Sequence, residues 1–285
     1  MERGQKRKRI ALLAAQPEEY RQAQFIRGFV REALKADMDV CVFSMFIKYQ
    51  STPGREIGDT SVFSLPDYES FDAVVVLGDT IQTPGAVSGI EDDLRSRYKG
   101  TVLFVDRESK YFDSVLIDNY LPIKKVVSHM IEVHGLRNIV FLTGKSWHPH
   151  SKIRQKAFID AMTEHGIAVD DSMLYNGDFW YTSGESLANE LCESGNPLPE
   201  GVCCANDCMA IGLAKGLINS GVKVPEQVKI AGYDTNEEGQ HAPIPLTSAP
   251  IPSEEFGEYS FRSVIRKMNG EDIDVFVPHT DLLIG

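Results

Sequence analysis

Hydrophobic residues along the chain gather in short, nearly continuous runs rather than in alternating ones. Such runs are typical of strands that are buried on both faces of a parallel sheet. Between them lie longer segments in which apolar residues recur every three or four positions, the spacing of an amphipathic helix. The runs predict strands at 10–14, 40–44, 73–77, 102–105, 139–143, 202–205 and 228–232.

The helical segments alternate with these strands, which requires right-handed crossovers and favours a doubly wound α/β fold. Residues 50–59 are rich in Gly, Thr and Ser and predict a loop. The periodicity predicts helices at 18–36, 86–98, 121–134, 151–165, 183–194, 207–220 and 254–268.

Several residue types mark where these helices begin and end. Thr182 and Glu185 have the spacing of a capping box, and Ser253 and Asn206 stand where N-cap residues are expected. Glycine ends a helix without steric cost because it adopts the left-handed backbone conformation. Glycines follow four of the predicted helices, at Gly135, Gly166, Gly195 and Gly221.

Length and charge limit the architecture and the partners. A chain of 285 residues is long enough for two lobes. Its net charge of −12 disfavours DNA binding by these residues, because a phosphate backbone repels an acidic surface. No apolar run is long enough to span a bilayer, and the basic stretch 1–9 is followed by no signal-peptide core. We therefore expect a cytoplasmic protein that does not associate with membranes.

The residues that could carry a metal or catalysis are few. The cysteines at 203, 204 and 208 lack the paired spacing of a zinc site, and core packing is the simpler reading of the first two. His148-Pro149-His150 predicts a surface loop. No phosphate-binding loop, nucleophile elbow or dinucleotide fingerprint occurs. We expect no metal, no cofactor and no enzymatic activity.

Polar residues come directly after three of the predicted strands. Asp106 and Arg107 follow the strand at 102–105, Asn206 and Asp207 follow 202–205, and Asp234 follows Tyr233. Ligands of doubly wound sheets bind beyond the carboxyl ends of the strands, so these side chains are candidates for a site. Asn and Asp also cap helices and form turns, and for Asn206 and Asp207 both interpretations are compatible.

Several segments resemble the effector-binding core of the lactose-repressor family, which shares its fold with type I periplasmic sugar-binding proteins. The resemblance covers nearly the whole chain. It rests mainly on 205–212, 221–225, 228–234 and 246–247, with support from 105–107, 118–119, 134–139 and 154–158.

This resemblance implies two doubly wound parallel-sheet lobes, joined by three crossover strands, that clamp a ligand in the cleft between them. It places the crossovers near 118–119, 245–250 and 269–272. The N-terminal lobe would comprise 8–118 and 248–269, and the C-terminal lobe 119–247 and 270–285.

The resemblance also implies which residues bind the ligand. The hydroxyl groups of a sugar donate and accept hydrogen bonds, so carboxylates, amides and guanidinium groups hold them together. Trp180 or Tyr181 could stack on an apolar sugar face, although core packing explains either ring equally well. The polar ligand-binding candidates are Asp106, Arg107, Arg154, Asn206 and Asp234.

Some positions depart from the family pattern. The segment Pro17-Glu18-Glu19-Tyr20 stands where relatives often have an aromatic pair. The side of the expected ligand cleft that the N-terminal lobe forms is therefore more acidic than in those relatives. A sugar-like effector is the leading expectation, and a cationic or nitrogen-bearing ligand is the alternative.

We therefore predict the effector-binding domain of a transcriptional regulator or signalling protein that forms a homodimer. The alternative is a solute-binding receptor of a sugar transporter, which would require a signal peptide. Only nine residues precede Ile10, whereas family repressors carry a helix-turn-helix headpiece there. Contact with DNA would then need a separate domain, and the output could equally be a diguanylate cyclase or a kinase.

Overall fold

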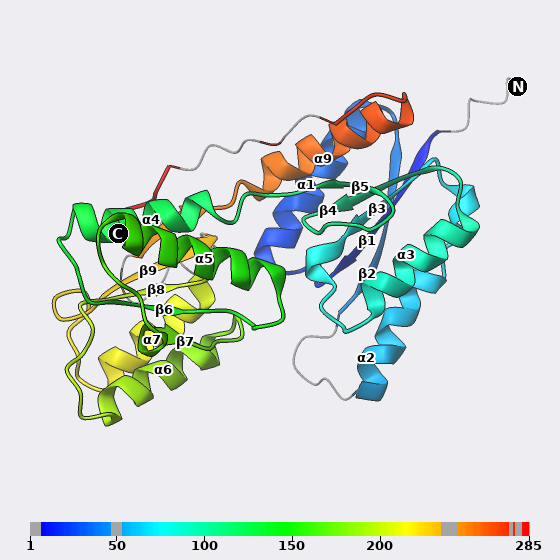
Figure 1. Cartoon of the computed structure of the whole chain (residues 1–285). Helices are drawn as coiled ribbons and strands as arrows, with labels where there is room; N and C mark the ends of the chain where they lie inside the picture. The colour runs from blue at the N-terminus through cyan, green and yellow to red at the C-terminus, as the bar shows by residue number, and fades with distance from the viewer. Residues whose placement is uncertain are drawn as a thin grey trace, which may run out of the picture. The chain divides into compact units, whose positions relative to one another are not determined.

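The computed structural model describes residues 7–46, 53–234, 244, 246–273, 276 and 281–284 of the chain. The chain forms two compact units. The first unit comprises residues 1–117 and 252–278, and the second comprises 118–251 and 279–285. The backbone therefore passes from one unit to the other three times (Figure 1). No helix among these described residues is long and apolar enough to cross a membrane.

Two of the boundaries between the units, 251/252 and 278/279, differ from the predicted boundaries at 247/248 and 269/270. The strand β10 (Thr247–Pro250) pairs in parallel with β9 (Lys229–Asp234), so it stays in the sheet of the second unit. After the helix α9 (Ser253–Met268), the described residues up to 276 still belong to the first unit.

The first unit has a five-stranded parallel sheet in the order β2-β1-β3-β4-β5. The 3-10 turns η1 (Ser61–Ser64), η2 (Tyr68–Ser70) and η3 (Gly78–Thr80) connect its elements. Its strands and helices, besides α9, are β1 (Arg9–Ala15), α1 (Tyr20–Lys35), β2 (Asp39–Met45), α2 (Pro53–Thr60), β3 (Ala73–Leu77), α3 (Ala86–Arg97), β4 (Thr101–Val105) and β5 (Asp113–Val115).

Both faces of this sheet are buried, which explains the continuous hydrophobic runs. Leu13 and Val76 point to one face, where they pack in a cluster with Leu94 of α3. Alternate side chains point the other way, toward the face that α1 and α9 cover. On that side the rings of Phe29 and Phe261 meet edge to face at 5.5 Å.

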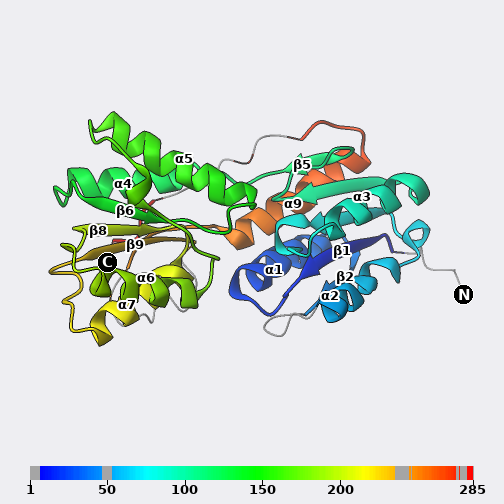
Figure 2. The same cartoon turned by 60° about the horizontal axis from the view of Figure 1, so that its bottom comes forward.

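The second unit repeats the plan with a parallel sheet in the order β10-β9-β8-β6-β7. Figure 2 shows α4 and α5 on one face of this sheet and α6 and α7 on the other. Its remaining elements are α4 (Leu121–Glu132), β6 (Ile139–Leu142), α5 (Pro149–Glu164), the 3-10 turn η4 (Asp171–Met173), β7 (Leu174–Tyr175), α6 (Tyr181–Glu193), β8 (Gly201–Cys204) and α7 (Asp207–Asn219).

All seven predicted strands and all seven predicted helices occur, with ends shifted by a few residues at most. The short strands β5, β7 and β10 were not predicted. The predicted loop at 50–59 is wrong over its described part, because α2 begins at Pro53. Proline suits the first position of a helix, where its missing N–H has no partner to lose.

The predicted helix signals have mixed outcomes. The four glycines at 135, 166, 195 and 221 are confirmed, with φ between 69° and 82°. The capping box at Thr182 is wrong: α6 begins one residue earlier, and Asp178 accepts hydrogen bonds from Trp180 N (2.9 Å) and Ser183 Oγ (2.7 Å). Ser253 is the first residue of α9, and Pro252 holds the N-cap position.

Cys203 and Cys204 are completely buried in β8, in agreement with the predicted core role. Burial raises the pKa of the Cys204 thiol well above its ordinary value, with smaller contributions from Cys203 and Asp207. A thiol that stays protonated is a poor nucleophile and a poor metal ligand.

The contact between α1 and α9 gives a test of the first unit. A Cβ atom on Gly28 would lie 2.0 Å from the carbonyl oxygen of Glu254, so the helices would have to separate. We expect Gly28→Ala to lower the free energy of unfolding by about 1–3 kcal/mol, as overpacking does. Urea denaturation followed by circular dichroism measures the change.

Gly89→Ala is the matched control, because Gly89 lies inside α3 and a Cβ there meets nothing within 4 Å. Alanine at that position should stabilise the helix by about 0.5–1 kcal/mol. If the two substitutions changed the free energy of unfolding equally, the close approach of the helices at Gly28 would be contradicted.

Candidate functional site

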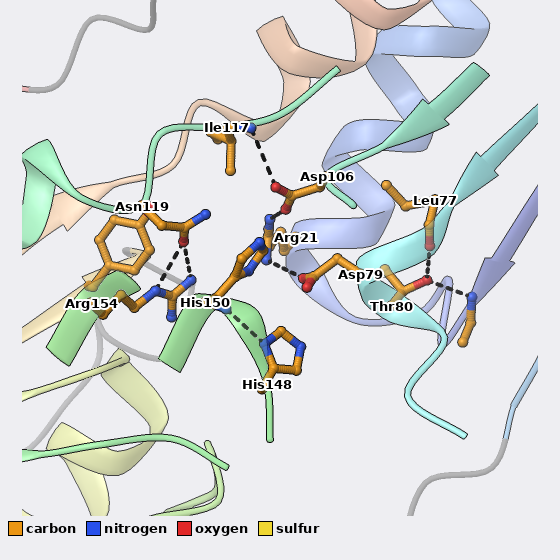
Figure 3. A network of polar contacts seen from close by, with 12 residues as sticks. Arg21, Leu77, Asp79, Thr80, Asp106, Ile117, Asn119, His148, His150 and Arg154 are labelled. Carbon is orange, nitrogen blue, oxygen red and sulfur yellow. Dashed lines mark hydrogen bonds and ion pairs between the residues drawn. The ribbon is translucent and has the colours of Figure 1, made fainter. Parts of the chain in front are cut away.

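Asp106 lies at the carboxyl end of β4 in the first unit and is 1% exposed. Its carboxylate forms an ion pair with Arg21 of α1 and accepts a hydrogen bond from the backbone N–H of Ile117 (3.4 Å). Arg21 also pairs with Asp79 at 3.3 Å, so one guanidinium group serves two carboxylates (Figure 3). Arg21, which follows the acidic segment 17–20 in the chain, therefore compensates the charges of Asp79 and Asp106.

Arg107, the neighbour of Asp106, is half-buried. Its aliphatic stem packs over Gly78 at the end of β3, where a Cβ atom would lie 2.9 Å from the Cβ of Arg107. Glycine at this position therefore lets the arginine stem lie close to the backbone, and the two residues meet at the same end of the sheet.

Arg154 is the centre of the polar residues in the second unit. It lies on α5 and is 4% exposed. The Oδ1 atom of Asn119 accepts from Arg154 Nε (3.0 Å) and Nη2 (2.6 Å), and the carbonyl oxygen of Ala205 accepts from Nη1 (2.8 Å) (Figure 3). These bonds fix the plane of the guanidinium group.

Two aromatic rings complete the surroundings of Arg154. Its Cζ atom lies 4.3 Å from the ring centre of Tyr233 and 5.6 Å from that of Phe179. Both distances are within the range of a cation–π contact. The Tyr233 hydroxyl donates to the carbonyl oxygen of Asp118 (3.4 Å), which connects β9 to the start of the second unit.

Trp180 is half-buried and stands at the N-cap position of α6, with its ring 5.3 Å from that of Tyr181. Its neighbour Phe179 is the ring that lies against Arg154. Phe179 also packs so closely on Gly144 that a Cβ there would lie 2.0 Å from Phe179 Cζ.

Asn206 caps α7, as predicted, because its Oδ1 accepts from the backbone N–H of Met209 (3.1 Å). Its Nδ2 donates to the carbonyl oxygen of Phe179 (2.9 Å) and so holds the segment that carries the ring. Asp207 is buried and accepts from Ser248 Oγ (2.8 Å), which ties α7 to β10.

Asp234 ends β9 and is half-buried. Its φ of 95° is left-handed, as are the values at Asp106 (54°), Phe179 (72°) and Gln16 (53°), which follows β1. Non-glycine residues adopt this conformation at a cost of about 1–3 kcal/mol, and such residues cluster at functional sites. Three of the five non-glycine residues with such φ values in the described part of the chain, Gln16, Asp106 and Asp234, lie at strand ends, whereas Asp37 precedes β2 and Phe179 precedes α6.

The predicted surface loop at His148-Pro149-His150 is wrong. His148 is 5% and His150 is 7% exposed, and the segment opens α5, with His148 Nδ1 accepting from His150 N (3.2 Å). Their rings lie 5.1 Å apart. Two imidazoles fall short of the ligand set of a zinc site, and no third such ligand group joins them among the described residues of the second unit.

The predicted residues therefore lie at strand ends and helix starts in both units. Sequence reasoning missed Arg21, Asp79 and Phe179, and it placed His148 and His150 in a surface loop. The hydrogen-bond partners of the first three residues are 27 to 85 positions away along the chain, so local spacing carries little signal of them. The left-handed backbone at Phe179 is equally invisible, because the residue is not glycine.

Known proteins resemble this chain in sequence and in fold. Residues 127–277 match the family model of the periplasmic binding protein-like domain. Catabolite control protein A of Priestia megaterium is 32% identical over 171 residues, which are 58% of this chain and 51% of that protein. The chain spans about half the length of the curated relatives it matches.

Solved structures share the fold over nearly the entire chain. The lac repressor dimer bound to operator and an anti-inducer has a TM-score of 0.79 at 17% identity, and the match covers 99% of this chain and 94% of that one. The complex of the transcriptional regulator CelR with cellobiose has a TM-score of 0.79 at 21% identity, covering 98% and 84%. These likenesses confirm the α/β fold with two parallel-sheet units.

The two bonds of Asn206 predict a graded loss of stability. Asn206→Ala removes the cap of α7 and the donor to Phe179, and we expect the free energy of unfolding to fall by about 1–2 kcal/mol. Asn206→Asp keeps the capping acceptor and loses only the donor, so its loss should be smaller. Both tryptophans of the chain, Trp147 and Trp180, lie in the second unit, so their fluorescence in urea reports on that unit. An Asn206→Ala protein as stable as wild type would contradict this assignment.

Proposed function

The chain belongs to the periplasmic binding protein-like domain family and has the effector-binding core of the lactose-repressor type, and on that premise we propose that it binds a small polar effector. The observation that carries the proposal is the fixed guanidinium group of Arg154, set between two aromatic rings beside the strand ends of the second unit. The relatives named above are regulators of transcription, so the chain is a binding protein rather than an enzyme.

Arg154, Asn206 and Asp234 of the second unit are the proposed polar contacts, together with Asp106 and Arg107 of the first. The proposed stacking ring is Phe179 or its predicted neighbour Trp180, and Phe179 is favoured because it lies beside Arg154. Neutral donors and acceptors on a ligand suit such a mixture of carboxylates, amides and guanidinium groups.

We propose a sugar-like effector rather than a cationic one. Arg21 already pairs with Asp79 and Asp106, which reduces the attraction of these two carboxylates for a cation. In the second unit, Arg154 contributes a further positive charge. The crystallised complex of CelR with cellobiose supports the same class of ligand.

We further propose that the full protein regulates transcription and that another domain makes the contact with DNA. The net charge of −12 supports this division, because an acidic surface repels the phosphate backbone. Binding of the effector would shift the balance between conformations by its differential affinity for them.

Ligand binding can be tested with the purified chain. Mass spectrometry first identifies small molecules that co-purify, and thermal-shift assays then screen sugars including cellobiose, nucleosides and amines. A true effector at a hundred times its dissociation constant should stabilise the protein by about 2.7 kcal/mol. We expect Asp234→Asn to weaken binding by about tenfold or more, because hydrogen bonds to charged groups contribute about 1.5–3 kcal/mol.

The control is Asp171→Asn, which removes an exposed carboxylate from η4 in the same unit. Its affinity for the effector should equal that of wild type. A normal thermal response of Asp234→Asn would refute the site, and a failure of every sugar in the screen would refute the proposed ligand class.

We also propose a homodimer, and the first unit offers a surface for it. The strand β2 lies at the edge of its sheet, and η1 packs against both β2 and α2. Large apolar side chains are exposed there: Val42 by 41%, Phe46 by 60%, Ile57 by 67% and Leu65 by 73%. Exposed apolar patches of this kind are typical of protein–protein contacts, and the lac repressor was crystallised as a dimer.

Ile57→Asp should therefore produce monomers. An unpaired carboxylate buried in an interface costs about 3–5 kcal/mol, which weakens the dimer by roughly a hundredfold or more. Val133→Asp, at an equally exposed position beside α4, is the control and should remain dimeric. Light scattering after size-exclusion chromatography measures the masses. A monomeric wild type, or dissociation by both variants, would contradict the proposed surface.

A further inference from the structure

The second unit has a cavity of about 360 Å³ at the outer edge of its sheet, beside β7. It is lined by the ends of β6 and β7, the loop after β7 and one stripe of α6. None of the side chains that surround Arg154 lines it, so this edge cavity is separate from the candidate effector site. Cavities of this size hold small molecules.

The polar lining of the edge cavity combines side chains that can donate, at Tyr175, Asn176 and Thr182, with two serines whose hydroxyl protons are already used. Ser186 donates its hydroxyl proton to the carbonyl oxygen of Thr182 (2.9 Å), and Ser183 donates to Asp178 (2.7 Å) or to the carbonyl oxygen of Trp180 (2.9 Å). A hydroxyl group has one proton to donate, so both serine oxygens turn lone pairs toward a ligand. The carboxylates of Asp178 and Glu190 add further acceptors.

The charge of the lining has one sign. The ten lining residues, all within the described part of the chain, include two carboxylates and no Lys, Arg or His. Burial and the nearby carboxylate of Glu190 raise the pKa of the Tyr175 phenol, so this hydroxyl stays neutral at physiological pH. The two carboxylates attract a cation, and the positive N-terminal end of α6 at Thr182 and Ser183 opposes part of that attraction.

The floor of the edge cavity is apolar. Leu187 is buried on α6, and Leu142 ends β6 beneath the helix. A methylene chain gains free energy by covering such side chains while its charged end stays at the polar rim. The ligand therefore needs an aliphatic stem and a head with several N–H donors.

We propose that the edge cavity binds a small aliphatic amine, whose ammonium group donates to Glu190, Asp178 and the serine oxygens. A primary ammonium group carries three N–H donors and no acceptor, which suits the carboxylates of Asp178 and Glu190 and the two serine oxygens. The cavity is large enough for a whole small molecule. This second ligand differs in charge from the sugar-like effector, so the two sites select different molecules.

The probe is putrescine, with the neutral 1,4-butanediol as a control of equal length. Isothermal titration calorimetry on the full chain should show saturable binding of putrescine, none of the diol, and weaker binding as salt is added. Glu190→Gln should weaken putrescine binding at least fivefold. Ser186→Met, which fills the cavity from an exposed position on α6, should abolish it.

Two variants decide the location. Glu193→Gln removes an exposed carboxylate from the same helix outside the edge cavity and should bind putrescine as wild type does. Asp234→Asn, in the candidate effector site, should also leave putrescine binding unchanged. The proposal is overturned by an absence of putrescine binding, by equal losses in Glu190→Gln and Glu193→Gln, or by loss of binding in Asp234→Asn. The last outcome would move the amine to the effector site and would favour a cationic ligand there over a sugar-like one.

Discussion

A guanidinium group that is removed from water must find its hydrogen bonds inside the protein, and in the second unit this requirement connects most of the polar structure. Arg154 donates hydrogen bonds to Asn119 at the start of the unit and to the carbonyl oxygen of Ala205 at the end of β8. The rings of Tyr233 and Phe179 then cover its faces. One buried cation thereby aligns the beginning of the unit, two strand ends and the segment before α6.

The parallel sheets explain why the polar residues meet where they do. All strands of a unit point the same way, so their carboxyl ends share one edge, and the turns into the helices must occur there. Gln16 follows β1, Asp106 follows β4 and Asp234 ends β9, and all three have left-handed conformations. The ion pair with Arg21 and the hydrogen bond from the Ile117 N–H hold the Asp106 carboxylate in place.

The sequence predicts the long elements well because each has a strong local pattern. Buried strands such as 73–77 are continuous apolar runs, and the glycines at the helix ends need the left-handed conformation that only glycine adopts easily. The strands β5 and β7 have only three and two residues, and β10 (Thr247–Pro250) has no run of large apolar residues, so none of the three carries the pattern of a buried strand. Polar residues at strand ends were predictable from the topology. The ion pairs of Arg21 and the ring of Phe179 were not, because they depend on contacts between distant segments.

The two polar regions of the second unit also depend on contacts that form only in the folded chain. Asn206 was predicted as a cap, but its second bond, to the carbonyl oxygen of Phe179, exists only in the folded chain and brings the ring to Arg154. Ser183 and Ser186 of α6 have no distinguishing pattern in the sequence. Only the structure shows that their hydroxyl groups donate to Asp178 and to the carbonyl oxygen of Thr182. One region then offers a positive charge between rings, and the other offers acceptors and negative charge over an apolar floor. The two regions therefore present different charges to a ligand, even though α6 or the segment that leads into it borders both.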